Sequence, residues 1–365
     1  MTSTSTLSSP IPAPHPADAE PALPVLAVDL VTDPALAPSL AELGRGIDAA
    51  GIGAIVLSDG GLHPIHAASA LAPATRRASV LARTDAVHVE PFHLATQLAS
   101  LDHIAHGRSG WLVTAATDPA VPAAVGRPQL DAEQTAQEAA DVLEASRLIW
   151  DSWTDDAVVR DIGSGVYVAA ARLQYADFEG RTFSVRGPAI TPRSPQGQVP
   201  VLVADADRAV VGEEVAAAAD GRALDVPVAG LPPQRIVELV ATALAEETAG
   251  ATPGAEVGRI RLVRLVGLIP DADLAAVLAE VAQALRDQGL ITAAPTEGAS
   301  LREQLGLPRH DVVIDPARRS DRARIARGET SLFTDHVAPR QPAPATAPAA
   351  APAPPAPEPH VEEIR

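Results

Sequence analysis

Residues 78–114 read ASVLARTDAVHVEPFHLATQLASLDHIAHGRSGWLVT. An apolar run over 78–89 is followed by helical spacing over 91–106 and by a second apolar run over 109–114. Gly107 provides a stop signal between the predicted helix and the second run. A strand, a helix and a strand at this spacing predict a βαβ unit, in which the two strands are parallel.

The same alternation extends in both directions from this unit. With an excursion over 155–200, it predicts an α/β fold, specifically a (β/α)8 TIM-type barrel. Only seven strands are counted, which leaves the barrel about one β/α unit short before Arg259. A missing unit predicts an open edge or a gap in the barrel, unless a partner or the tail fills it. The predicted strands are 25–31, 54–57, 78–89, 109–114, 201–203, 223–228 and 259–269, and the predicted helices are 38–50, 66–74, 91–106, 131–153, 209–219, 233–247 and 271–288.

The ends of the chain differ from this body in composition. Residues 1–23 are rich in Ser, Thr, Pro and Ala, and they are predicted to be disordered. The barrel domain is expected over 24–310, followed by a C-terminal extension over 311–365. From about residue 339 the extension is almost wholly Pro and Ala, which predicts an unstructured tail.

Composition excludes several functions. A net charge of −18 argues against nucleic acid, because binders of the phosphate backbone need a cationic face. The sequence has no Cys and no Lys, which excludes thiolate nucleophiles, cysteine-ligated metals and Schiff-base chemistry. No secretory signal precedes residue 24 and no apolar run reaches membrane-spanning length, so a cytoplasmic protein without membrane contact is expected.

Four blocks along the chain carry a resemblance. They resemble, in the same order, segments of the luciferase-like, flavin-dependent monooxygenase family, in the branch that contains the large components of nitrilotriacetate monooxygenases. The blocks are EPFHLA at 90–95 with ASLDHIAHGRSGW at 99–111, LIWDSWTDDAVVRD at 148–161, DFEGRTFSVRGPAITPRSPQG at 177–197 and SLREQLGLP at 300–308.

The resemblance implies a cofactor and partners. Reduced FMN, supplied by a separate flavin reductase, would lie at the carboxyl-terminal mouth of the barrel and react with O2 to oxygenate a small organic substrate. In such chemistry the cofactor performs the difficult step, while the protein positions it and excludes water. A homo-oligomer is also expected.

Five residues are candidates for contact with the cofactor. Asp59 corresponds to an aspartate at a strand end in the family, and Thr84 and His88 lie near the position of a family threonine. Trp111, on a predicted strand, faces either the ligand or the core. Arg208 is a candidate partner for the phosphate.

Glu90 and His93 are the candidate catalytic residues. They lie between a predicted strand end and the next helix start, where barrel active sites are built. A histidine there could act as an acid or base near neutral pH. No metal site is predicted, because the histidine pairs 63/66 and 103/106 lack a third ligand and are typical of a polar helix face.

Two stretches depart from the family pattern. Residues 121–147 lack the His and Tyr that the family carries at the start of its long fourth helix. After the fifth strand the family has small residues that let a phosphate approach a helix start, whereas this chain has Asp205 and Asp207. Two interpretations therefore stay open: an active two-component monooxygenase, or a non-catalytic paralogue that keeps the barrel and binds flavin weakly or not at all. A deazaflavin enzyme of the same superfamily is disfavoured, since no cationic or glycine-rich pocket for its tail is found.

Overall fold

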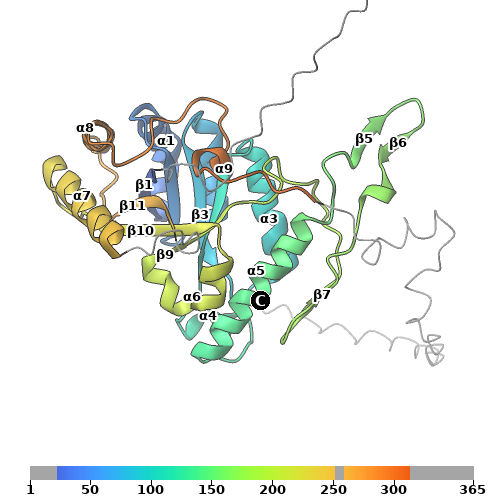
Figure 1. Cartoon of the computed structure of the whole chain (residues 1–365). Helices are drawn as coiled ribbons and strands as arrows, with labels where there is room; N and C mark the ends of the chain where they lie inside the picture. Colours follow the sequence, from blue (N-terminus) through green and yellow to red (C-terminus); the bar gives the residue numbers. More distant parts are fainter. Residues whose placement is uncertain (1–22, 251–258, 313–365) are drawn as a thin grey trace, which may run out of the picture. The chain divides into compact units, whose positions relative to one another are not determined.

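Seven parallel strands form a closed barrel (Figure 1). The computed structural model describes residues 23–250 and 259–312, so nearly all of the two predicted tails lies outside the described residues. Around the barrel the strand order is β1-β11-β10-β9-β4-β3-β2. The strands are β1 (Val25–Thr32), β2 (Ala54–Asp59), β3 (Ser79–Asp85), β4 (Ser109–Thr114), β9 (Val201–Ala204), β10 (Gly221–Pro227) and β11 (Ile260–Val266).

Helices alternate with these strands and cover the outside of the barrel. The predicted strand over 78–89 ends early, at Asp85, and the helix predicted from residue 209 begins at Asp205. The helices are α1 (Leu40–Ala49), α2 (Pro64–Leu71), α3 (Pro91–Ile104), α4 (Ala120–Ala124), α5 (Ala132–Trp150), α6 (Asp205–Ala218), α7 (Pro233–Gly250), α8 (Leu274–Asp287) and α9 (Leu301–Gln304). None of these described helices has the length and apolarity of a membrane span.

The barrel closes with seven strands, so the count of seven is confirmed and the predicted open edge is wrong. β1 pairs with β2 on one side and with β11 on the other, where Val25 lies opposite Leu262. Barrel diameter increases with the number of strands, so seven strands enclose a narrow interior. Small and aliphatic side chains suit that interior, and the buried ones are Val25, Ala27, Ala54, Val56, Leu81, Leu112, Leu202, Ala204, Ala223 and Leu262.

The short helix α9 closes the amino-terminal end of the barrel. Its Leu301, together with Leu305 just after it, is buried in the same cluster as the interior side chains. Gly110 on β4 makes room for this contact, because a Cβ there would lie 2.6 Å from Leu301 Cδ2. The fourth block of the resemblance therefore forms the floor of the barrel.

A buried hydrogen-bond cluster joins three of the resembling blocks. The carboxylate of Asp102 accepts bonds from the Ser109 N–H and hydroxyl, from the Ser194 hydroxyl and from Gln196 Nε2. Gln196 Oε1 in turn accepts the backbone N–H of Arg302 at 2.8 Å. Because Asp102 is fully buried and its partners come from separate segments, these blocks secure the scaffold.

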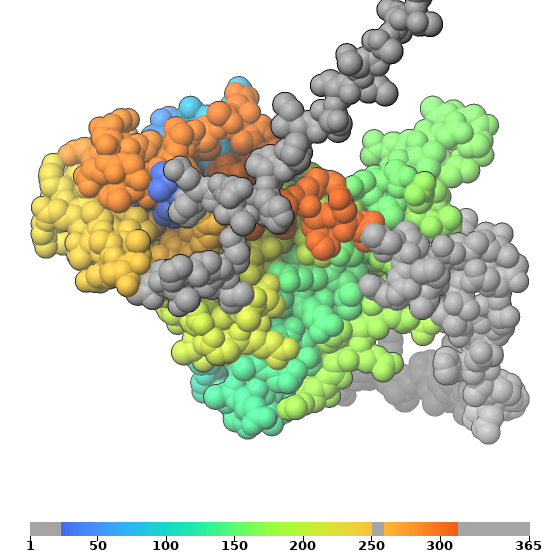
Figure 2. All heavy atoms as spheres, viewed as in Figure 1, coloured from blue at the N-terminus to red at the C-terminus, as the bar shows by residue number. Residues whose placement is uncertain are grey.

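The excursion over 155–200 contains two short antiparallel pairs. β5 (Val158–Asp161) pairs with β6 (Val166–Val168), and β7 (Phe178–Glu179) pairs with β8 (Ser184–Val185). The β5–β6 hairpin stands out from the surface at the upper right (Figure 2). This segment therefore contributes no strand to the barrel.

Candidate functional site at the barrel mouth

A polar cavity of about 290 Å³ opens at the carboxyl ends of β2, β3 and β4, and we call it the mouth cavity. In parallel barrels this end carries the active site, because every strand delivers a loop there. Its volume lies just below the range of about 300–1,000 Å³ typical of ligand pockets. The mouth cavity is lined by Asp59, His63, Pro64, Arg83, Thr84, Asp85, Thr114, Ala115, Ala116, Thr117 and Asp118.

A polar layer lies directly above the apolar interior. Side chains two residues apart on a strand share a face, so each member of this layer follows an apolar interior residue on its own strand. The layer mixes both signs of charge. Its members are Asp29, Ser58, Arg83, Thr114, Asp225 and Arg264.

Arg83 connects this layer to the start of α6. Its Nε donates to Asp207 Oδ2 at 2.8 Å, and its Nη2 donates to Asp207 Oδ1. The Thr114 hydroxyl donates to the same Oδ1 at 2.8 Å. The hydrogen bonds that Arg83 donates to Asp207 raise the pKa of Arg83 above its usual value, so this guanidinium stays charged. Asp207 is 3% exposed, and Arg83 lines the mouth cavity, so the ion pair lies buried beside that cavity.

Arg264 makes a second buried ion-pair group on the other side of the barrel. Its Nε donates to Asp225 Oδ1 at 2.7 Å, and its Nη1 lies 3.3 Å from Asp29 Oδ1. Asp29 also accepts the Ser58 hydroxyl at 2.6 Å. Burial raises the pKa of Asp29, while Arg264 and Ser58 lower it.

Asp85 differs from the other carboxylates at the mouth. It lies at the end of β3 on the wall of the mouth cavity. Among the residues that the structure describes, its side chain accepts no hydrogen bond. Burial raises its pKa to about 6, which the nearby Arg83 only partly opposes. Asp85 can therefore exchange a proton near neutral pH.

Two of the five predicted cofactor contacts line the mouth cavity. Asp59 ends β2, and its Oδ1 accepts the Gly61 N–H at 2.8 Å. Thr84 lines the same cavity. Trp111 does not reach it: the side chain is fully buried among outward-facing residues, and its indole N–H donates to the Thr84 carbonyl at 3.0 Å. Of the two alternatives for Trp111, the structure places it in the core, because inward and outward positions alternate along β4.

The three candidates in the β3–α3 loop and the first turn of α3 lie outside the mouth cavity. Glu90 is the N-cap of α3, and its carboxylate accepts the backbone N–H groups of Phe92 and His93. His93 is exposed in the first turn of the helix. His88 has a positive φ of 58° and donates its backbone N–H to Glu138 Oε1. The structure gives Glu90 a capping role, and it brings neither Glu90 nor His93 to the cavity wall.

The start of α6 is occupied by groups from the protein itself. Asp205 pairs with Arg222, and the Ala206 N–H donates to Asp225 Oδ2 at 3.1 Å. Arg208 pairs with Glu213 on the helix surface rather than with either aspartate of the first turn. The residues at this position do not fit a phosphate, because the first turn carries two carboxylates and the nearby arginines are already paired. Those around the mouth cavity include carboxylate and hydroxyl groups that can hydrogen-bond a polar ring.

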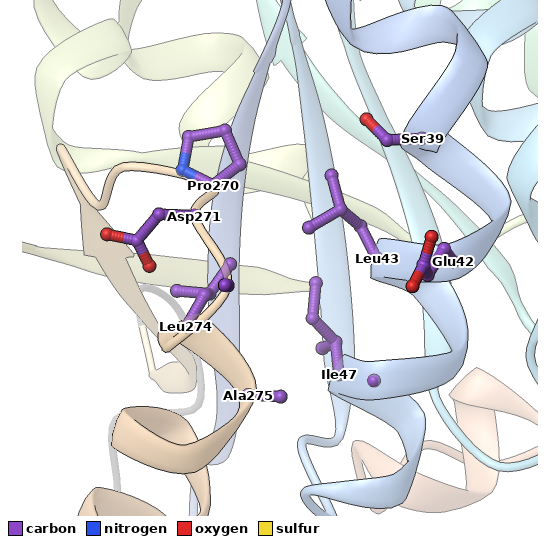
Figure 3. A pocket seen from close by; sticks show the side chains of 10 residues that line it. Ser39, Glu42, Leu43, Ile47, Pro270, Asp271, Leu274 and Ala275 are labelled. Atoms are coloured by element: carbon purple, nitrogen blue, oxygen red, sulfur yellow. The ribbon is translucent and has the colours of Figure 1, made fainter.

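A larger recess, of about 360 Å³, lies on the outside of the barrel between α1 and α8 (Figure 3). Leu43 and Ile47 of α1 lie across it from Leu274 of α8. The two carboxylates, Glu42 and Asp271, come from opposite sides. Since no strand end contributes to it, this groove lacks the convergent polar groups of an active site.

Metal ligands do not gather at the mouth. The rings of His63 and His66 have centroids 5.1 Å apart. Burial lowers the pKa of His63, and the neighbouring His66 lowers it further. Within residues 23–250 and 259–312, no group of three or more His, Asp or Glu side chains is arranged to hold a metal ion.

Sequence reasoning missed Asp85 and the charged layer. The signal was present, because Asp29, Arg83 and Arg264 interrupt strands that are otherwise apolar. Alternation places each of them on the same face as an interior residue. The sequence does not show which carboxylate pairs with each arginine, because the partners lie on other strands and helices.

The fold and this mouth define the class of protein. The sequence matches the family described as luciferase-like monooxygenase over residues 23–336, and the chain belongs to that family of flavin-dependent enzymes. The family predicted from the four blocks is thereby confirmed.

Individual relatives cover only part of the chain. N-acetyl-S-(2-succino)cysteine monooxygenase of Bacillus subtilis is 36% identical over 141 residues, 38% of this chain and 32% of the relative. Dibenzothiophene-sulfone monooxygenase of Rhodococcus erythropolis is 33% identical over 164 residues, 45% and 35% of the two chains. Nitrilotriacetate monooxygenase component A of Aminobacter aminovorans is 33% identical over 157 residues, 43% and 34% of the two chains. The chain thus spans about a third of the length of each of these relatives.

Solved structures agree on the fold. The long-chain alkane monooxygenase superposes with a TM-score of 0.62 at 16% identity, covering 81% of this chain and 98% of the other. EDTA monooxygenase from Chelativorans sp. BNC1 gives a TM-score of 0.59 at 18% identity, covering 80% of this chain and all of the other. The α/β barrel is therefore shared at low sequence identity.

Proposed function

We propose that this chain is the oxygenating component of a two-component monooxygenase, which takes reduced FMN or a related flavin from a separate reductase and uses O2 to oxygenate a small organic substrate. The observation that carries the proposal is the polar mouth cavity, with Asp59 on its wall, in a barrel of this family. The relative named as component A of nitrilotriacetate monooxygenase supports a system of more than one component.

The residues of the cavity have separate tasks in this proposal. Asp59 presents a carboxylate that can accept an N–H or O–H group of a bound ring. Asp85 holds a proton on its carboxyl oxygen below about pH 6 and can release or accept one near neutrality. Reduced flavin, when bound, supplies the electrons for the reaction with O2. The Arg83–Asp207 and Arg264–Asp225 ion pairs hold polar side chains in fixed positions next to the cavity.

The relatives do not define the substrate. Their names specify a succinylated cysteine, a tricarboxylate and a sulfone, which differ in charge and shape. Specificity in this fold depends on loops, so the substrate class must be tested directly.

A second function is favoured by one specific observation. The guanidinium of Arg83, on the wall of the mouth cavity, is already paired with Asp207, and the first turn of α6 carries two carboxylates. A non-catalytic paralogue that keeps the barrel without binding flavin would have these features, and it would act through a partner protein.

Flavin titration separates the two functions. We expect quenching of flavin fluorescence and a rise in the melting temperature as flavin is added. A ligand at about a thousand times its Kd stabilises the folded state by about 4 kcal/mol. Asp59→Ala should weaken binding, and Asp271→Ala in the α1/α8 groove is the matched control. Absence of both quenching and thermal shift at millimolar flavin would instead support the non-catalytic paralogue.

A further inference from the structure

The first turn of α6 carries two carboxylates and a backbone N–H that is already bonded, whereas a phosphate-binding helix start has free N–H groups and no negative charge of its own. α6 follows β9, the fifth strand of the barrel in sequence order, where the resemblance places the phosphate. A helix start binds an anion through free N–H groups and the positive end of the helix dipole. Here Asp205 and Asp207 stand in the first turn, and the Ala206 N–H is already bonded to Asp225.

The arginines on these elements are all engaged. Arg222 donates to Asp205 and to both carboxylate oxygens of Glu247. Arg208 donates to Glu213 through two nitrogens. Arg83 and Arg264 belong to the buried ion pairs of the mouth. A phosphate would have to displace a carboxylate from a guanidinium.

The charges around α6 and the mouth are predominantly negative. Ten carboxylates accompany four guanidiniums there, so the phosphate of a bound flavin meets net repulsion. The carboxylates are those of Asp29, Asp59, Asp85, Asp118, Asp205, Asp207, Glu213, Glu214, Asp225 and Glu247, and the guanidiniums are those of Arg83, Arg208, Arg222 and Arg264.

Space at the helix start is also short. The recess lined by Asp205, Arg208 and Arg222 has a volume of about 10 Å³. A site for a single water needs roughly 10–15 Å³ on this measure. A phosphate group does not fit without opening the helix.

A second recess with arginines gives no better position. It has a volume of about 360 Å³ and is lined by Arg127 and Arg181. Arg127 is held by two hydrogen bonds to Glu138, a carboxylate that is 2% exposed. Arg181 lies at the surface, 4.0 Å from Glu133. Its charge is therefore both solvated and partly compensated.

We propose that the barrel recognises the uncharged part of a flavin and gains nothing from the phosphate, so that riboflavin binds at least as tightly as FMN. This inference rests on the proposed function, and it defines the ligand class as a flavin selected by its ring and side chain. The phosphate of FMN adds a charge of about −1.5 to −2 at neutral pH, which the carboxylates around α6 oppose.

Parallel titrations test this selectivity. Fluorescence quenching is measured with riboflavin, FMN and lumiflavin at low and high salt. We expect FMN to bind about three- to tenfold more weakly than riboflavin at low salt, and the gap to narrow as salt screens the repulsion. Tighter binding of FMN than of riboflavin, at either salt concentration, would overturn the inference and leave the proposed function standing. Binding of none of the three would overturn both.

A variant that removes one negative charge provides a second test of the selectivity. Asp205→Asn removes one carboxylate at the helix start, and it should shift the FMN-to-riboflavin ratio toward FMN by severalfold without weakening riboflavin. Asp271→Asn removes the same charge in the α1/α8 groove and should leave the ratio unchanged. Melting temperatures of both variants verify folding. An unchanged ratio in folded Asp205→Asn would contradict the electrostatic basis.

Discussion

The guanidinium of Arg83 on β3 donates two hydrogen bonds to the carboxylate of Asp207 at the start of α6, across 124 positions of sequence. This pair joins the two halves of the barrel at the mouth. Replacing one member of a buried pair leaves the other uncompensated, which is more costly than replacing both.

We therefore expect Asp207→Ala to lower the free energy of unfolding by about 2–3 kcal/mol, somewhat below the fully buried case because the Arg83 side chain is 27% exposed. The double variant Arg83→Leu/Asp207→Ala should recover most of this loss. Urea unfolding measures both. Glu213→Ala, on the surface of α6, is the control and should leave the midpoint unchanged. Equal losses in the single and double variants would argue against the pairing.

Asp85 should make stability depend on pH. Its pKa is about 6 in the folded chain and 3.8 without the fold, so between these values the folded state holds more protons than the unfolded state. The stabilisation that comes from the protonated Asp85 carboxyl is fully present below about pH 4, and it is lost as pH rises through about 6. Asp85→Asn should then stabilise the protein at pH 7.5 by roughly 2–3 kcal/mol and flatten the pH profile between 4 and 6. Chemical unfolding across pH 4–8 tests this, and an identical profile in the variant would refute it.

Glu90 and His93 can be separated by stability and turnover. Glu90→Ala removes the cap of α3 and should cost about 1 kcal/mol, while Glu90→Ser keeps a capping oxygen and should cost much less. If Glu90 acts only as a cap, Glu90→Ser retains turnover. A stable Glu90→Ser protein without turnover would restore the catalytic hypothesis. For His93, an unchanged turnover in His93→Ala would exclude a role as acid or base.

Gly110 and Leu301 should be energetically coupled through the floor of the barrel. A Cβ at position 110 would lie 2.6 Å from Leu301 Cδ2, so Gly110→Ala should be destabilising. Leu301→Ala alone should cost about 2–5 kcal/mol through its cavity. In the double variant the contact with Leu301 is gone and only the contact with Leu81 Cγ, at 3.1 Å, remains, so the loss should be smaller than the sum of the two. A double-mutant cycle by urea unfolding gives the coupling energy, and strict additivity would contradict the contact.

The sequence by itself determined the repeat of strands and helices. The alternation over 78–114 and its continuation predicted seven strands, because apolar runs and helix stop signals are local properties. It also determined the family, since the four blocks survive in order. These blocks proved to carry the scaffold: Asp102, Gln196 and Arg302 meet in one buried cluster far along the chain from each other.

Closure of the barrel was decided by the tertiary structure. Whether seven strands leave a gap depends on strand tilt and on the size of interior side chains from every strand, which no single segment specifies. The pairing of β1 with β11 settles it.

The sequence predicted only part of the candidate site. Asp59 was predicted from its strand end and lies on the wall of the mouth cavity, whereas Asp85 and the Arg83–Asp207 pair emerged only from the fold. The position of Asp205 in the sequence indicated a conflict with a phosphate, but not that Arg222, Asp225 and Glu247 already surround that helix start. Such contacts are made between residues on different strands and helices, so the ionic environment of the mouth is a property of the folded barrel.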